Sequence, residues 1–395
     1  MTTLCPSVKK NYTEIRREKD ITRRFTESRS EIIYYSHILG QIKMIKVLIV
    51  EDSPVMQQLL IHAISSDPDF VIVGAAYDGE EAVEAVKELN PDIVAMDWQM
   101  PKLDGKQATR IIMETCPTPI VIVTSSLAAK DVVFSFSMIE AGALAIVKKP
   151  SSVDHPDYEK DKQELIQTLK LMSEVKIVRR TKREFEKYTH TETAIENKIK
   201  EETSIQIIVI GASTGGPLVL QKILSRLPKN LPVPLLIVQH ISHGFTEGFV
   251  EWLKSTTNFQ LHIASDGEKL LPGHGYVAPD DFHMGVESGP RIVLSNHNLE
   301  NGLRPSVAFL FRTAAQVFGH RAVGILLTGM GRDGADELKL LKEKGAVTFV
   351  QDNESSVVHG MPGEAIKLDA ATYILSPEDI TTALITLIKK MNGEF

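Results

Sequence analysis

The stretch IQIIVIGASTGGP, residues 205–217, decides the fold of the C-terminal half of the chain. Its first part is an almost unbroken apolar run rich in β-branched residues, which is typical of a parallel strand buried on both faces. The next five residues read G-x-S-x-G, and their small side chains allow a sharp strand-to-helix turn that exposes Ser213 at the carboxyl end of the sheet. Because open α/β sheets bind ligands at that end, the stretch predicts an α/β domain and makes Ser213 a candidate functional residue.

Two other interpretations of this glycine-rich turn stay open at this point. It can be a structural turn in which Ser213 caps the following helix, and from the motif alone this interpretation is favoured. A phosphate cradle fits less well, because no lysine follows Gly216 as in a P-loop and the glycines do not have the G-x-G-x-x-G spacing. Other parts of the chain must decide between them.

Composition and charge restrict the kind of protein. The chain has 395 residues, 43% of them hydrophobic and 24% charged, so it is long enough for two or three domains with separate cores. A net charge of −7, without a basic helix interleaved with aromatic residues, argues against nucleic-acid binding. The two cysteines, Cys5 and Cys116, provide neither a disulfide framework nor a cysteine-based zinc site. No apolar run reaches the length of a membrane span, so we expect a cytoplasmic protein that does not insert into membranes.

Two polar segments flank the first predicted domain. Residues 1–43 mix basic and acidic clusters with few apolar positions, and we expect a disordered extension there. Met44 stands directly before the first strand-like run, so one hypothesis is that translation starts at Met44. Residues 176–203 are dense in mixed charge and predict a linker, with a longer amphipathic helix as the alternative.

Between residues 44 and 175, apolar runs alternate with helical patterns, which predicts a parallel sheet with helices on both faces. Glu51 and Asp52 follow the first run, Asp97 follows the third, and Lys149 follows the fifth. If the strands lie side by side, three carboxylates converge with one ammonium group, and such oxygen donors suit a hard cation such as Mg²⁺. The alternative is that each acidic residue is simply solvated. The expected strands are residues 46–50, 71–76, 93–96, 120–124 and 144–147, and the expected closing helix is 161–174.

Four motifs of this region together resemble the receiver domain of two-component response regulators, over about residues 44–170. They are KVLIVEDSP (46–54), AMDWQMPKLDG (95–105), IVTSS (122–126) and the pair Lys149-Pro150.

The resemblance implies that Asp97 accepts a phosphoryl group and that Glu51, Asp52 and Asp97 hold Mg²⁺. It also implies that Thr124 and Lys149 contact the phosphoryl oxygens. These roles are chemically reasonable, because phosphoryl transfer to a carboxylate requires mainly positioning and nearby cations.

The sequence departs from many receivers at Ile146, where they carry an aromatic residue three positions before the lysine. Rotation of an aromatic ring at that position is therefore not part of this switch. We expect the coupling to run through Thr124 and its loop.

In the second predicted domain, residues 204–395, two strand-like runs end in residues that a serine nucleophile needs. His240 follows the run LLIVQ, and Asp333 lies in the turn TGMGRDG after AVGILL. Strand ends at one edge of a parallel sheet lie close together, so Ser213, His240 and Asp333 can converge as nucleophile, base and orienting carboxylate. His243 raises the alternative of a histidine metal pair, which the absence of an obvious further ligand nearby disfavours. The further expected strands are residues 235–239, 275–278, 291–294, 322–327 and 346–351.

Five motifs of the second domain, behind a receiver, are similar to the chemotaxis protein-glutamate methylesterases of bacteria, the CheB family, over about residues 44–390. They are GASTGGP (211–217), IVQHI (237–241), GYVAPDDFHM (275–284), RPSV (304–307) and LLTGMGRDGA (326–335). This resemblance implies that Ser213 is the nucleophile, His240 the general base and then acid, and Asp333 its orienting carboxylate. The expected oxyanion donors are the backbone amides near Thr214 and Met330.

The resemblance also implies the reaction and the partners. The substrate would be a γ-glutamyl methyl ester on the cytoplasmic domain of a chemoreceptor, and the same site could deamidate glutamine. A chemotaxis histidine kinase would supply the phosphoryl group. The hydrolysis would need no cofactor, and we expect a monomer.

The expected architecture is α/β, with two doubly wound parallel-sheet domains: a flavodoxin-like receiver (44–175) and a Rossmann-like three-layer methylesterase domain (204–395), joined by a linker (176–203). We expect the unphosphorylated receiver to cover the cleft containing Ser213 through a modest, fairly polar interface. A fragment beginning near Ser204 should then be more active than the unphosphorylated chain.

Three questions remain open from the sequence. Arg304 can position the acidic substrate helix or form a structural salt bridge. A carboxylesterase acting on a different substrate is one rival function. A non-catalytic signalling module controlled by phosphorylation is the other.

Overall fold

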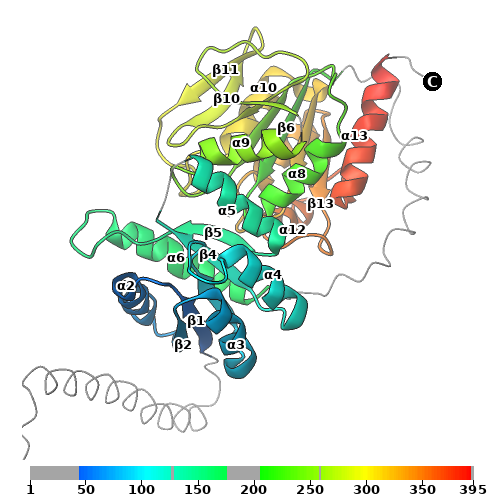
Figure 1. Cartoon of the computed structure of the whole chain (residues 1–395). Helices are drawn as coiled ribbons and strands as arrows, with labels where there is room; N and C mark the ends of the chain where they lie inside the picture. The colour runs from blue at the N-terminus through cyan, green and yellow to red at the C-terminus, as the bar shows by residue number, and fades with distance from the viewer. Residues whose placement is uncertain (1–43, 126–128, 176–204, 258, 393–395) are drawn as a thin grey trace, which may run out of the picture.

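The computed structural model describes residues 44–125, 129–175, 205–257 and 259–392, which form an N-terminal and a C-terminal domain (Figure 1). The expected extension (1–43) and linker (176–203) lie outside the described residues. Both domains are α/β with a parallel main sheet, as the sequence predicts.

The N-terminal domain contains a five-stranded parallel sheet in the order β2-β1-β3-β4-β5. Three of its helices begin at residues whose side chains accept from first-turn amides: Ser53, Asp78 and Asp104. Each such cap typically contributes about 1 kcal/mol. The strands are β1 (Ile45–Val50), β2 (Phe70–Ala76), β3 (Ile93–Met96), β4 (Ile120–Thr124) and β5 (Ala145–Lys148). The helices are α2 (Pro54–Ser65), α3 (Gly79–Leu89), α4 (Gly105–Thr115), α5 (Ala129–Ala141) and α6 (Tyr158–Ser173).

The C-terminal domain contains a seven-stranded parallel sheet in the order β14-β13-β12-β6-β7-β9-β8. Its strands are β6 (Ile207–Ala212), β7 (Leu235–Gln239), β8 (Gln260–Ile263), β9 (His274–Val277), β12 (Ala322–Leu326), β13 (Val347–Gln351) and β14 (Tyr373–Leu375). Its helices are α8 (Gly216–Arg226), α9 (Thr246–Thr257), α10 (Val307–Val317), the 3₁₀ turn η2 (Gly319–Arg321), α11 (Ala335–Glu343), α12 (Met361–Lys367) and α13 (Pro377–Asn392).

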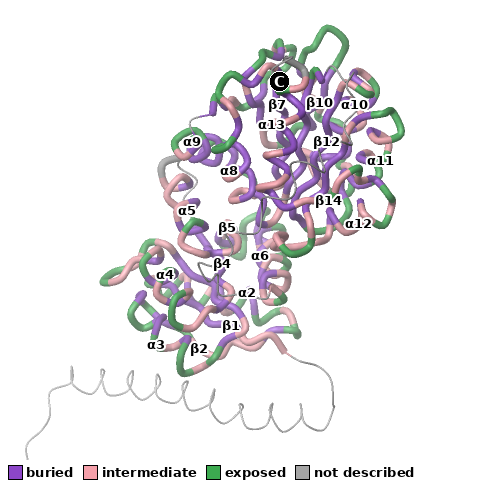
Figure 2. The backbone as a smooth tube through the Cα atoms, turned by 90° about the vertical axis from the view of Figure 1, so that its right-hand side faces the viewer, coloured by how far each residue is buried: buried purple, intermediate pink, exposed green. Residues whose placement is uncertain are grey.

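The central strand β6 is buried on both faces, which explains its continuous apolar run. Ile208 and Ile210 pack in one core with helices α8, α9 and α13. Ile207 and Val209 point the other way, into a second core with α10, α11 and α12. Figure 2 shows the buried strands between the two helical layers, so the domain has three layers.

One expected strand does not belong to the main sheet. Arg291–Ser295 (β11) pairs antiparallel with His283–Glu287 (β10), and together they form a separate two-stranded sheet. This pair packs on α10, where the bare Gly285 leaves room for Phe309. The run RIVLS had the composition of a strand, but composition does not say which sheet a strand joins.

The two domains share an apolar contact between α5 and α9. Phe136 of α5 stacks on Trp252 of α9 with ring centroids 5.0 Å apart, and it also lies against Phe249 at 5.4 Å. All three side chains are buried. Polar bonds flank them, because Glu140 accepts from Trp252 Nε1 at 3.1 Å and from Gln221 Nε2 at 2.9 Å. The expectation of a fairly polar interface is therefore wrong for this part of the contact.

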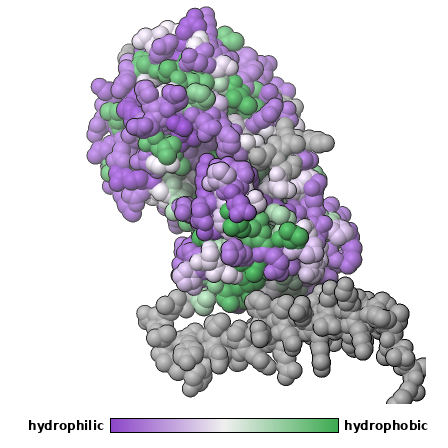
Figure 3. Space-filling model, turned by 90° about the vertical axis from the view of Figure 1, so that its left-hand side faces the viewer, coloured by the Kyte–Doolittle hydropathy of each residue, from purple (hydrophilic) through white to green (hydrophobic). Residues whose placement is uncertain are grey.

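On the face shown in Figure 3, the upper domain is mostly hydrophilic with scattered hydrophobic groups, and a larger hydrophobic group lies on the lower domain. Among the described residues, no helix is both long and apolar enough to cross a bilayer.

Candidate active site and phosphorylation site

The turn after β6 places Ser213 at the carboxyl edge of the sheet. Gly215 has a φ of +79°, a left-handed conformation that favours glycine, and a Cβ there would lie 2.6 Å from Val357 Cβ. The chain can therefore reverse within two residues of Ser213 and enter α8 at Gly216. The Ser213 amide donates to Thr328 O at 3.0 Å, which ties the turn to the loop after β12.

His240 and Asp333 meet beside this serine, as the strand order predicts. β6 lies between β7 and β12, so the residues following all three strands share one edge. The His240 amide donates to Ala212 O at 2.9 Å, and its ring nitrogen Nε2 lies 3.0 Å from Asp333 Oδ2. The Asp333 side chain is 2% exposed and that of His240 10%, so the imidazole is the more accessible partner.

Asp333 is held by a dense set of donors. Its carboxylate accepts from Ser306 Oγ at 2.7 Å, Val307 N at 2.6 Å and Asn301 Nδ2 at 2.9 Å, besides contacting His240. Burial alone would raise the pKa of Asp333, but the contacts with His240, Asn301 and Ser306 outweigh it and lower the pKa to about 2. Asp333 is therefore a permanent anion at neutral pH.

Sequence reasoning missed Asn301 and Ser306. Ser306 precedes α10 without capping it by its own side chain, and Asp333 takes over that role by accepting from the Val307 and Ala308 amides. Nothing in the local sequence of Asn301 indicates this contact, because its partner is 32 residues away.

Within the described chain, the Ser213 hydroxyl makes no hydrogen bond to the His240 ring. The pairing of Ala212 with Gln239 nevertheless makes Ser213 and His240 the next residues on adjacent strands. In the absence of substrate, catalytic hydrogen bonds are often longer than in the reacting complex.

The expected oxyanion donors lie close to the nucleophile. Gly329 packs so closely on Ser213 that a Cβ on it would lie 2.6 Å from Ser213 Cβ, and Met330 follows directly. Among the described residues, the backbone amides of Thr214 and Met330 donate to no other group. Both amides are therefore available to a bound oxygen.

Arg304 and His243 make contacts that the sequence did not indicate, and substrate positioning by Arg304 stays a prediction. Arg304 Nη1 donates to Asn296 O and His297 O, both at 3.0 Å, so its side chain is bonded to the main chain of the preceding loop. No salt-bridge partner of Arg304 occurs among the described residues. His243 lies 3.3 Å from Asp281. In the described ranges it is not part of any group of three metal ligands.

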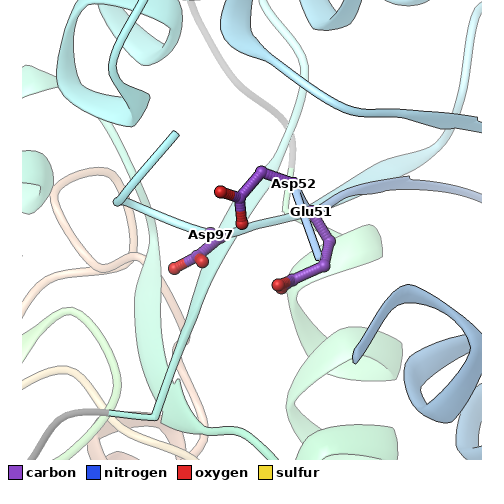
Figure 4. A group of neighbouring side chains, drawn as sticks. All are labelled: Glu51, Asp52 and Asp97. Carbon is purple, nitrogen blue, oxygen red and sulfur yellow. The ribbon is translucent and has the colours of Figure 1, made fainter. Parts of the chain in front are cut away.

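In the N-terminal domain, the three predicted carboxylates do converge. Oxygens of Glu51, Asp52 and Asp97 lie within 4.8 Å of one another, and Figure 4 shows them gathered at the strand ends. Lys149 Nζ lies 2.7 Å from both Glu51 Oε2 and Asp97 Oδ2. Glu51, Asp97 and Lys149 are buried, whereas Asp52 is exposed.

Burial and ion pairing together set the pKa values in this cluster. It raises the pKa of Glu51 despite the opposing effect of Lys149. Burial alone would lower the pKa of Lys149, but the charges and hydrogen bonds of Asp97 and Glu51 outweigh it and raise the pKa. Lys149 thus remains an ammonium group facing the predicted phosphoryl acceptor.

Thr124 has a partner that sequence reasoning missed. Its hydroxyl accepts from the Trp98 indole Nε1 at 2.9 Å, and the Trp98 ring lies 4.8 Å from that of Phe134 on α5. Ile146, in place of the usual aromatic residue, packs partly buried against the core. An aromatic side chain therefore does contact Thr124, but it comes from the residue after Asp97.

Comparison with known proteins is consistent with both halves of this geometry. The family model described as CheB methylesterase matches residues 208–384, and that of the response regulator receiver domain matches residues 47–155. A protein-glutamate methylesterase/protein-glutamine glutaminase of Nitrosospira multiformis is 53% identical over 345 residues, which cover 87% of this chain and 97% of the relative. The chain belongs to this methylesterase family.

Further relatives and a solved structure resemble this methylesterase. A protein of the same name from Geobacter metallireducens is 51% identical over 87% of this chain and 99% of its own length. The crystal structure of the Thermotoga maritima CheB methylesterase catalytic domain is 38% identical; the match covers 47% of this chain and 99% of that chain, with a TM-score of 0.45.

In this methylesterase, the receiver helix α6 reaches the edge of the candidate active site. Glu164 accepts a short hydrogen bond from Ser242, two residues after His240. Gln167 Nε2 lies 3.8 Å from Met330 Sδ, beside the expected oxyanion donor. Val358, in the segment after β13, packs against the receiver core. These contacts place the receiver against the candidate catalytic edge.

Proposed function

We propose that this chain is a phosphorylation-activated serine hydrolase that demethylates glutamate methyl esters on the cytoplasmic domains of chemoreceptors. The observation that carries the proposal is the 3.0 Å contact of His240 with the buried Asp333, next to Ser213, in a chain whose relatives are named protein-glutamate methylesterases. A non-catalytic signalling module would have no need of a buried carboxylate that orients a histidine beside an accessible serine.

In the proposed reaction, Ser213 Oγ attacks the ester carbonyl carbon while His240 takes the hydroxyl proton. Because Nε2 of His240 faces Asp333, Nδ1 is the nitrogen that receives this proton. The amides of Thr214 and Met330 stabilise the oxyanion, and each such donor typically lowers the barrier by roughly 3 to 4 kcal/mol. His240 then protonates the leaving methoxide, methanol departs, and water hydrolyses the acyl-serine to release the glutamate carboxylate and free Ser213.

The same groups support deamidation of glutamine side chains. Acylation then differs only in its leaving group, which departs as ammonia after His240 has protonated it. The deacylation step is identical, so both activities require the same triad.

In the receiver, Asp97 is the proposed phosphoryl acceptor. Its carboxylate oxygen would attack the phosphorus of a phosphohistidine on a chemotaxis histidine kinase, and the histidine would leave. Three clustered carboxylates fit a hard cation, so Glu51, Asp52 and Asp97 would hold Mg²⁺. A bound Mg²⁺ would offset charge on the transferring oxygens. Lys149, whose Nζ lies 2.7 Å from Asp97 Oδ2, and Thr124 would contact the oxygens of the phosphoryl group.

Regulation would follow from the position of α6. Glu164 and Gln167 contact Ser242 and Met330, so in the unphosphorylated chain they would cover the edge that a receptor helix has to reach. Charge added at Asp97 would change the contacts of Thr124 and loosen this cover. The proposed compartment is the cytoplasm, since the proposed substrates and the kinase act there.

The test of the proposed hydrolase is methanol release from membranes that carry methyl-labelled receptors. Ser213→Ala and His240→Ala should each lower turnover by a factor on the order of a million, with Asp333→Asn milder, because the triad acts as a unit. Retention of even about a tenth of the activity in Ser213→Ala would show that Ser213 is not the nucleophile. Full biological function of that variant would instead favour a binding module.

A further inference from the structure

The last residue of β7, Gln239, is a buried polar side chain to which the proposed mechanism assigns no task. Its side chain points to the gap between the two catalytic turns and is 4% exposed. Its Nε2 donates to Ser213 O and to His240 O, both at 2.8 Å. One carboxamide thus bonds to the main chain of the proposed nucleophile and of the proposed base.

The two hydrogen bonds of Gln239 lie just beyond the paired ends of β6 and β7. The final ladder bond between these strands runs from His240 N to Ala212 O, and after it β6 turns into α8 while β7 continues into a loop. Carbonyl oxygens accept and never donate, so both hydrogens of the Gln239 amide group must face them, which fixes the orientation of the carboxamide. Gln239 is therefore a direct hydrogen-bonded link across the diverging ends.

The packing of the other amide atom shows how closely this link is fitted. Gln239 Oε1 is buried without a partner among the described residues. A Cβ on Gly216 would lie 2.2 Å from it, a distance that real side chains do not adopt. The third glycine of GASTGGP, Gly216, thus leaves the space that the Gln239 carboxamide occupies. A buried oxygen without a partner is unfavourable and calls for an explanation.

We propose that Gln239 is a positioning residue that fixes Ser213 relative to His240. It touches no reacting atom, and it acts by holding the two main-chain carbonyls at one separation so that the serine hydroxyl stays within reach of the imidazole. The inference rests on the proposed roles of Ser213 and His240.

The first test uses Gln239→Met, which keeps the length of the side chain and removes both donors. In the full-length chain, the rate of covalent labelling of Ser213 by a fluorophosphonate should fall by about a hundredfold, the typical effect of a misplacement of about 1 Å. Turnover of methylated receptor should fall likewise in kcat, with KM unchanged, because the receptor-binding surface is intact. Wild-type labelling and kcat in a folded variant would overturn the proposal.

The matched control is Gln57→Met in the receiver domain. Gln57 is also buried, and its Nε2 donates to two main-chain carbonyls, Glu51 O and Ala76 O, both at 3.3 Å. The Gln57→Met substitution removes an equivalent pair of hydrogen bonds in the other domain. The rate of fluorophosphonate labelling of Ser213 should therefore stay within about twofold of wild type. An equal fall in both variants would assign the effect to general loosening and contradict a positioning role.

A second variant, Gln239→Glu, decides the question even if Gln239→Met does not fold. The ionised carboxylate would present only acceptors to the two carbonyls, whereas the protonated form has one O–H donor and restores one bond. The labelling rate relative to wild type should therefore rise as the pH is lowered from 8 to about 5, and a pH-independent ratio would overturn the proposal. Labelling that persists in Ser213→Ala would instead refute the proposed nucleophile, whatever the behaviour of Gln239.

Discussion

At the scale of single residues, Asp333 serves two structural purposes at once. It contacts His240, and it accepts from the first amides of α10 in place of a side-chain cap from Ser306. The second purpose explains why a residue expected only to orient a base is so completely buried. It also means that replacing Asp333 affects stability as well as catalysis.

The lowered pKa of Asp333 leads to a prediction about stability and pH. Its pKa falls from the usual 3.8 to about 2 in the folded protein, so the ionised form stabilises the fold above about pH 4. This contribution, about 2 kcal/mol, should disappear as the pH falls from 4 towards 2. The free energies of unfolding of wild type and Asp333→Asn, measured by urea titration, should therefore differ most near neutral pH and converge in acid. A difference that is constant down to pH 2 would contradict the assignment.

The exposed carboxylate of the receiver cluster provides a second prediction. Asp52 faces solvent beside Asp97 and Glu51, and it lacks the buried contact with Lys149 that its two neighbours make. Asp52→Asn should weaken Mg²⁺ binding at least about tenfold in a calorimetric titration, because one of three oxygen donors loses its charge. Glu84→Gln, which removes an equally exposed acid on α3, is the control. Equal affinities in wild type and Asp52→Asn would remove Asp52 from the metal site.

At the scale of elements, the strands that carry the functional residues were predictable, and the contacts around them were not. β3 and β6 are continuous apolar runs, and so are most of β1 and β7, because helices cover both their faces. Residues that follow parallel strands must share an edge. The strands that were missed, β8, β10 and β14, are short or lie away from the centre of the main sheet, so their sequences carry little signal. Asn301 and Gln239 were missed because their roles depend on loops that meet only in the folded chain.

The receiver helix α6 is the element whose role is easiest to test. Glu164→Ala with Gln167→Ala removes the contacts to Ser242 and Met330, so the closed arrangement loses stability and the unphosphorylated rate should rise. A tenfold rise requires only about 1.4 kcal/mol. The rate is measured as methanol release without a phosphodonor.

A matched variant on the same helix controls this experiment. Glu159→Ala changes an acid whose ion pair, with Lys162, lies within α6, and it should leave the rate unchanged. If the double variant is folded and equally slow, α6 does not restrict access to Ser213.

At the scale of the whole molecule, the contact between the domains has two unlike parts. The aromatic cluster of Phe136, Phe249 and Trp252 joins α5 to α9 as a buried core, whereas α6 meets the catalytic edge mainly through polar groups. The composition of α5 gave no sign of this, because its apolar residues are equally compatible with the core of its own domain. In the proposed regulation, an apolar contact beside a polar one would allow the receiver to uncover Ser213 without leaving the methylesterase domain.

The proposed phosphorylation site is connected to the aromatic part of this contact. Trp98, next to Asp97, bonds to Thr124 and packs on Phe134 of α5, the helix that also carries Phe136. A change at Asp97 can thus reach α5 through side chains that touch, despite the isoleucine at position 146.

The central claim is that a phosphoryl group on Asp97 controls hydrolysis at Ser213, and one measurement tests it most directly. Methanol release from methyl-labelled receptor membranes is followed for the full-length chain with Mg²⁺, with and without a small-molecule phosphodonor. We predict a stimulation of at least about tenfold in wild type, none in Asp97→Asn, and no release in Ser213→Ala under either condition. Stimulation of Asp97→Asn equal to that of wild type would contradict the account.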